Sequence, residues 1–103
     1  MDLKQIRHHL HQYPEVSGEE KDTSIFIAEK LNELGVSKIH QNFAEHSILA
    51  EIDFSAPGKT LLFRAELDAL PIEEVNTFSH RSKFQNTSHK CGHDGHMTIL
   101  LGL

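Results

Sequence analysis

The sequence contains one cysteine, no tryptophan and no long apolar run. A single cysteine cannot form a disulfide within the chain, which suits a reducing compartment, so we expect a cytoplasmic protein. No apolar stretch approaches the roughly 20 residues that cross a bilayer, so we expect no membrane partner. The net charge is −5 and no run of Lys or Arg occurs, so no basic patch would balance nucleic-acid phosphates. These features argue against membrane-spanning and nucleic-acid-binding classes of protein.

Apolar residues at helical spacing predict three helices. Leu3, Ile6 and Leu10 indicate a first helix that Asp2 caps and Pro14 ends. A second helix is predicted over residues 17–34, with Ser17 as the N-cap of a capping box. A third helix is predicted near the C-terminal end of the sequence, with Asp94 as its N-cap.

Between the second and third helices the apolar period changes to that of strands. Residues 38–43 indicate a weak strand, and residues 47–54 alternate well between apolar and polar side chains. Residues 60–65 contain the apolar run 61–63, which is typical of a strand covered on both faces. The short turn at residues 56–59 predicts that these last two strands pair as an antiparallel hairpin. Residues 72–90 are polar and irregular, and loops of this length are usually functional or mobile.

Cysteine, histidine and carboxylate side chains cluster in residues 89–96 (HKCGHDGH). Thiolate, imidazole and carboxylate are the groups that bind zinc-like metals. Cys91 and His93 are two residues apart, so in an extended segment both point the same way. The segment therefore predicts part of a hydrolytic metal site, although this spacing alone is equally compatible with a buried, inert cysteine. His8 and His11, on the first helix, are instead interpreted as part of a solvated polar face.

Two carboxylates follow the third predicted strand. Glu66 and Asp68 stand at alternate positions, so they point to the same side of an extended chain. Open α/β sheets usually have their active crevice at the carboxyl ends of strands. The same pattern is also typical of a charged strand end in solvent. If a metal binds at residues 89–96, Asp68 or Glu66 could orient a metal ligand or contact the metal.

Three separated segments carry a family resemblance: residues 7–15 (RHHLHQYPE), 63–74 (FRAELDALPIEE) and 89–96. Together they resemble the metal-dependent amidohydrolases of the aminoacylase and carboxypeptidase type, a group with hippurate hydrolases, N-acyl-amino-acid amidohydrolases and auxin-conjugate hydrolases. The resemblance implies an α/β fold, as a truncated part of a three-layer, zinc-peptidase-like catalytic domain with helices packed on a mixed sheet. It also implies a small-molecule N-acyl amino acid substrate.

The same resemblance implies the site residues. Cys91 and His93 would be metal ligands of a centre with two divalent ions, manganese or zinc, with cobalt or nickel also possible. Asp68 is the expected catalytic residue. Glu66 stands where the family usually has aspartate, and Lys90 stands where a small residue is usual.

Residues 1–103 would then form the N-terminal part of the catalytic domain. The apolar pattern continues to Leu103, so we expect a fragment without the dimerisation domain and the second half of the catalytic domain. The full-length protein would be a homodimer, and the fragment inactive. Two alternatives remain: a cysteine amidase with Cys91 as nucleophile, and a metal-binding remnant without catalysis.

Overall fold

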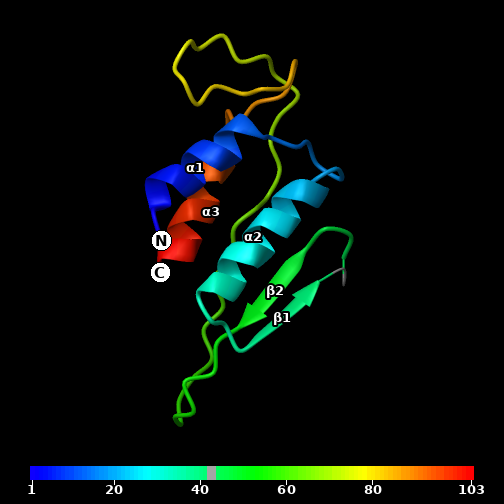
Figure 1. The fold of residues 1–103 in the computed structure, drawn as a ribbon. Coiled ribbons are helices and arrows are strands. Elements are labelled where there is room, and N and C mark those ends of the chain that lie inside the picture. The colour runs from blue at the N-terminus through cyan, green and yellow to red at the C-terminus, as the bar shows by residue number, and fades with distance from the viewer. Residues whose placement is uncertain (42–43) are drawn as a thin grey trace.

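Three helices and a two-stranded sheet form the regular structure of residues 1–41 and 44–103, the part that this computed structural model describes (Figure 1). Part of the predicted strand 38–43 lies outside the described residues. No described helix combines the length and apolarity needed to cross a membrane. In chain order the elements are α1 (Leu3–Gln12), α2 (Lys21–Glu33), β1 (Lys38–Gln41), β2 (Ile48–Glu51) and α3 (His93–Gly102).

The core lies where the first and last helices meet. Helices α1 and α3 pack side by side although they come from opposite ends of the sequence (Figure 1). As predicted, Asp2 caps α1, because its carboxylate accepts a hydrogen bond from the backbone N–H of Gln5 at 3.2 Å. The apolar stripe of α1 is buried with side chains from α2 and α3. This core consists of Ile6, Leu10, Ile27, Met97 and Leu101.

The N-terminus of α2 is capped from outside the helix. The predicted capping box at Ser17 is wrong, because α2 begins at Lys21 and its N-cap residue makes no side-chain capping bond. The Glu15 carboxylate accepts hydrogen bonds from the backbone N–H groups of Asp22 at 3.3 Å and Thr23 at 2.5 Å. It also accepts one from the Thr23 hydroxyl at 2.6 Å. These bonds satisfy donors that the first turn leaves without intrahelical partners.

Strand β2 pairs with β1 rather than with the segment that follows it. The two strands are antiparallel, with Ile39 opposite Ala50. The predicted hairpin between residues 47–54 and 60–65 is therefore wrong, and residues 60–65 belong to no ladder in the described chain. Apolar alternation indicates an extended chain, but it does not identify the strand's partner.

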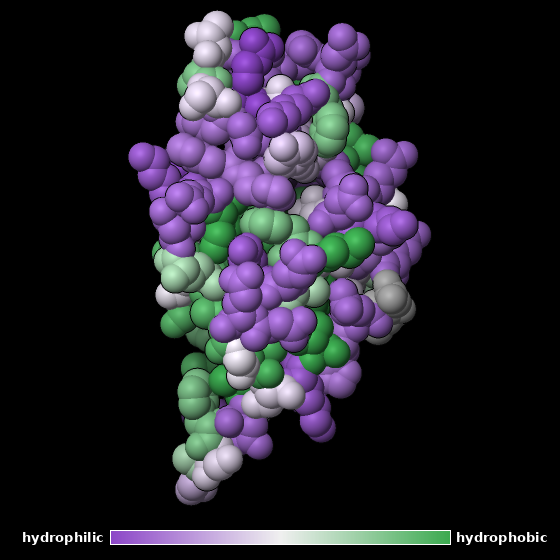
Figure 2. Space-filling model, viewed as in Figure 1, coloured by the Kyte–Doolittle hydropathy of each residue, from purple (hydrophilic) through white to green (hydrophobic). Residues whose placement is uncertain are grey.

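The apolar run 61–63 is exposed, although its composition predicts a strand covered on both faces. Leu61, Leu62 and Phe63 are 73%, 80% and 60% exposed. The chain measures 50 × 28 × 20 Å along its principal axes. Apolar side chains reach the surface at the narrow lower end of the molecule (Figure 2). In this part of the chain, composition does not determine burial.

Helix α3 begins at His93, with Gly92 as its N-cap residue in a left-handed conformation (φ 98°). The prediction that Asp94 caps this helix is wrong, because Asp94 lies inside its first turn. A left-handed backbone suits glycine, which has no Cβ to clash. The turn at Gly92 thus sets the direction in which α3 leaves residues 89–92, and His93 becomes its first residue.

Candidate metal centre

The carboxylates Glu66 and Asp68 lie on an extended segment that is held just after Asp68. The Ala69 backbone N–H donates to the Glu15 carbonyl oxygen at 2.8 Å. Leu70 and Ser88 exchange two backbone hydrogen bonds, both of 3.0 Å. These bonds fix the segment between the start of the chain and the loop 72–90.

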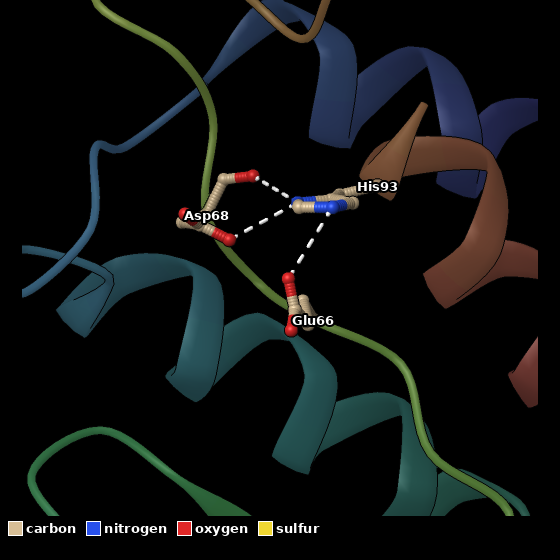
Figure 3. A group of neighbouring side chains, drawn as sticks. All are labelled: Glu66, Asp68 and His93. Atoms are coloured by element: carbon tan, nitrogen blue, oxygen red, sulfur yellow. Dashed lines mark hydrogen bonds and ion pairs between the residues drawn. The ribbon is translucent and has the colours of Figure 1, made fainter. Parts of the chain in front are cut away.

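His93 faces both carboxylates from the first turn of α3 (Figure 3). Its Nδ1 lies 2.8 Å from the backbone oxygen of Asp68 and 3.0 Å from the carboxylate Oδ1 of the same residue. Its Nε2 lies 3.4 Å from Oε2 of Glu66. One ligand atom from each of the three residues lies within 4.8 Å of the others. We call Glu66, Asp68 and His93 the carboxylate–histidine group.

The contacts of His93 define its tautomer. A backbone carbonyl oxygen only accepts hydrogen bonds, so Nδ1 of His93 must carry the proton that it shares with Asp68. In the neutral ring Nε2 then keeps its lone pair and faces Glu66. A histidine ligand to a metal usually donates its other ring N–H to a carboxylate or a backbone carbonyl. These contacts fix the orientation of the His93 ring.

Cys91 does not join the carboxylate–histidine group. It is exposed, and in the described part of the chain the set of neighbouring ligand atoms contains Glu66 rather than this thiol. The structure therefore brings together His93, Asp68 and Glu66 of the residues that the sequence singles out. The assignment of Cys91 as a ligand stays a prediction, as do the roles of Asp68 and His93.

The donor set and a neighbouring buried histidine fit a divalent cation. Imidazole nitrogen and carboxylate oxygen are ordinary ligands of zinc and manganese. His89 is 5% exposed, and neither of its ring nitrogens has a hydrogen-bond partner among the described residues. Burial lowers the pKa of His89 to about 4. A neutral, buried imidazole without a partner favours a ligand nearby, because an unsatisfied buried polar group destabilises the fold. The sequence places His89 in the cluster of residues 89–96, but its burial depends on the tertiary fold.

His11 is the second histidine whose position the sequence does not reveal. The expectation of a solvated face is wrong for this residue, because its ring lies between two buried carboxylates. Its Nδ1 is 2.8 Å from Asp94 Oδ2, and its Nε2 is 2.9 Å from Glu74 Oε2. Each ring nitrogen of His11 therefore has a carboxylate oxygen as its partner. Both partners are distant in sequence, at 83 and 63 residues.

The Glu74 carboxylate is held ionised by its neighbours. Burial opposes the charge, but hydrogen bonds from Lys90, the Ser82 backbone N–H, His11 and Asn76 outweigh it and lower the pKa of Glu74 to about 2. A carboxylate with several charged or backbone donors is a strongly bound element of a polar network. Glu74 therefore stabilises the otherwise irregular loop 72–90.

Acidification should destabilise the protein through Glu74. The folded pKa of about 2 lies below the ordinary value of 4.5. The stabilisation is therefore fully present above pH 4.5 and is lost as the pH falls through about 2. Urea titrations across this range should give a decreasing free energy of unfolding, with at most about 3 kcal/mol from Glu74. Glu74→Gln should show a shallower decrease, and identical pH profiles for both proteins would contradict this assignment.

An imidazole flanked by two carboxylates on an α/β scaffold is an arrangement that could hold a metal ion. No family model matches the sequence. The chain is 43% identical to thermostable carboxypeptidase 1 of Saccharolobus solfataricus, over 95% of this chain and 25% of that protein. It is 42% identical to the N-acyl-L-amino acid amidohydrolase of Geobacillus stearothermophilus, over 98% of this chain and 27% of that protein.

A solved structure of similar sequence also has the same fold over most of this chain. The YXEP protein of Bacillus subtilis, described as a dinuclear metal binding peptidase from the M20 family, superposes with a TM-score of 0.90. It is 35% identical, over 97% of this chain and 28% of that one. The chain is homologous to part of the M20 amidohydrolases, aminoacylases and carboxypeptidases, and it spans about a quarter of the length of the relatives it matches. The predicted resemblance and the α/β class are both confirmed.

Proposed function

We propose that residues 1–103 form the N-terminal part of the catalytic domain of a metal-dependent amidohydrolase, which hydrolyses the amide bond of N-acyl amino acids. The observation that carries this proposal is the carboxylate–histidine group, in which His93 is oriented by Asp68 and faced by Glu66. The name of the Geobacillus stearothermophilus relative, an N-acyl-L-amino acid amidohydrolase, supports the substrate class.

In this proposal His93 and Cys91 are metal ligands, and Asp68 is the catalytic residue that holds His93 in the ligating tautomer. The Asp68 backbone oxygen accepts a hydrogen bond from the Nδ1–H group, so Nε2 is the nitrogen that would bind the metal. Glu66 presents Oε2 to the same nitrogen at 3.4 Å and would add a carboxylate ligand. Cys91, two residues before His93, would add a thiolate ligand from the turn that precedes α3.

The proposed centre takes two divalent ions, manganese or zinc, with cobalt or nickel as further candidates. When bound, such ions supply Lewis acidity that makes a water nucleophilic near neutral pH and polarises the carbonyl of the amide. The description of the Bacillus subtilis structure as dinuclear supports the number of ions. The imidazole and carboxylate donors of the group suit these metals.

The full-length protein is proposed to be a cytoplasmic homodimer whose partner in catalysis is a small molecule. The chain covers about a quarter of the relatives it matches. The resemblance also implies that the general base and further ligands come from outside residues 1–103. We therefore expect little activity from this chain alone.

Chelation separates this function from a cysteine-nucleophile amidase. In the full-length protein, EDTA should abolish the release of amino acids from N-acetyl and N-benzoyl amino acids, and added manganese or zinc should restore it. Iodoacetamide should inactivate the metal-free protein faster than the metal-loaded one, because a bound ion shields a ligating thiolate. A thiol enzyme would survive chelation and lose activity to iodoacetamide with or without metal. Metal binding without hydrolysis would indicate a non-catalytic protein.

A further inference from the structure

One buried carboxylate is tied to both ends of the short segment that carries the predicted ligands. Glu74 is 2% exposed. Its Oε2 accepts a hydrogen bond from Lys90 Nζ at 2.9 Å. The same oxygen lies 2.9 Å from His11 Nε2, and the other ring nitrogen of His11 lies 2.8 Å from the buried Asp94 carboxylate.

These contacts reach residues that flank the two predicted ligands in the sequence. Lys90 immediately precedes Cys91, and Asp94 immediately follows His93. Glu74 therefore holds one end of residues 90–94 directly and the other end through the His11 ring. Together with the chain from residue 90 to residue 94, these contacts form a closed loop of interactions that contains Cys91, Gly92 and His93.

This closed loop of contacts restrains the turn at Gly92, because glycine has more backbone freedom than other residues. Gly92 has a φ of 98°, and an added Cβ would meet nothing nearer than 3.8 Å. Local packing therefore does little to restrict this turn. Glycine loses the most conformational entropy when it is fixed, so anchors at both ends reduce the ordering that metal binding would otherwise require.

Glu74 is itself fixed by contacts that do not involve the segment. The Ser82 backbone N–H donates to its Oε1 at 2.7 Å, and the Asn76 side chain donates to Oε2 at 3.2 Å. The carboxylate is therefore a rigid anchor rather than a group that follows the segment. Lys90 compensates its charge, so this tie is charge-assisted, and His11 provides the hydrogen-bonded tie to the other end.

We infer that Glu74 is a positioning residue that, through Lys90 and the His11–Asp94 pair, presets the spacing of Cys91 and His93 for metal binding. This inference rests on the proposed function, because it assumes that Cys91 and His93 bind a metal. Outer residues that orient ligands typically change metal affinity by about 10–100-fold when they are removed. We expect a loss in that range when the Glu74 charge is removed.

The test measures cobalt(II) and zinc(II) affinity in the full-length protein with Glu74→Gln. This substitution keeps the size of the side chain and removes its charge. The matched control is Glu73→Gln, the neighbouring exposed carboxylate, which accepts a hydrogen bond from the backbone N–H of Asn86. We expect a dissociation constant about 10–100-fold higher for Glu74→Gln, with a weaker cobalt–thiolate absorption band. For Glu73→Gln we expect both properties to stay at wild-type values. A change of stability alone would not alter the absorption of a folded, metal-saturated sample.

A second variant covers the case in which Glu74→Gln fails to fold. Lys90→Met cuts only one of the two ties and leaves the His11–Asp94 pair in place, so we expect a smaller loss of affinity than for Glu74→Gln. Wild-type affinity and an unchanged cobalt spectrum in a folded Glu74→Gln or Lys90→Met protein would overturn the inference. Absence of metal binding by the wild-type protein would overturn the proposed function, and the inference with it.

Discussion

Replacing His93 with alanine should abolish tight metal binding and metal-dependent amide hydrolysis in the full-length protein. His93 is the residue on which the contacts of the carboxylate–histidine group converge, and its Nδ1 proton is already held by Asp68. Removal of the imidazole leaves Glu66 and Asp68 without the neutral nitrogen donor between them. Removal of a residue that merely orients a ligand costs about 10–100-fold in affinity, so loss of the ligand itself should exceed about 100-fold. Titration calorimetry with zinc or manganese measures the change directly.

His40→Ala is the matched control for this experiment. His40 is an exposed imidazole on β1 that pairs with the Glu51 carboxylate at 2.7 Å, within the hairpin. Its removal deletes a histidine and a carboxylate contact without touching the carboxylate–histidine group. We expect the metal affinity of His40→Ala to equal that of the wild type. If His93→Ala binds metal as tightly as His40→Ala does, the assignment of the centre is wrong.

Leu10→Ala should cause a large loss of stability. Leu10 is 2% exposed and belongs to the core formed by α1, α2 and α3. Truncation of a buried leucine costs about 2–5 kcal/mol, because the transfer free energy is lost and a cavity remains. Since a domain is stable by only about 5–15 kcal/mol, this is a large fraction of the total. Thermal and urea unfolding followed by circular dichroism should show it.

The exposed leucine Leu61 offers the comparison for Leu10. The same truncation, Leu61→Ala, removes an equal number of atoms from a side chain that is largely in solvent. Surface substitutions of this kind usually change stability by less than about 0.5 kcal/mol. Equal losses for the two variants would mean that the core is not centred on the contact of α1 with α3.

The sequence predicts the helices and the site segments well where a local pattern is sufficient. The stripe Ile6 and Leu10 identifies the buried face of α1, and Asp2 identifies its start. The alternate positions of Glu66 and Asp68 predict that both point to one side, and both face His93. In each case the relevant geometry is set within a few residues, by the period of a helix or of an extended chain.

Features that depend on the tertiary fold could not be predicted in the same way. Strand β2 pairs with β1. This pairing could not be predicted, because alternation within a strand carries no information about the neighbouring strand. His11 is held between carboxylates that are more than 60 residues away. The buried His89 likewise lies in a polar segment with no apolar pattern. For such residues the chemical type is visible in the sequence, but the environment that determines its use is not.

Glu15 accepts hydrogen bonds from two parts of the molecule, with its side-chain carboxylate and with its backbone carbonyl oxygen. Its side chain caps α2, whereas its main-chain oxygen accepts the hydrogen bond of Ala69, next to Asp68. Only the first of these depends on which amino acid occupies position 15. A different residue at position 15 would therefore alter the beginning of α2, whereas the main-chain hydrogen bond that secures the segment beside Asp68 would be kept.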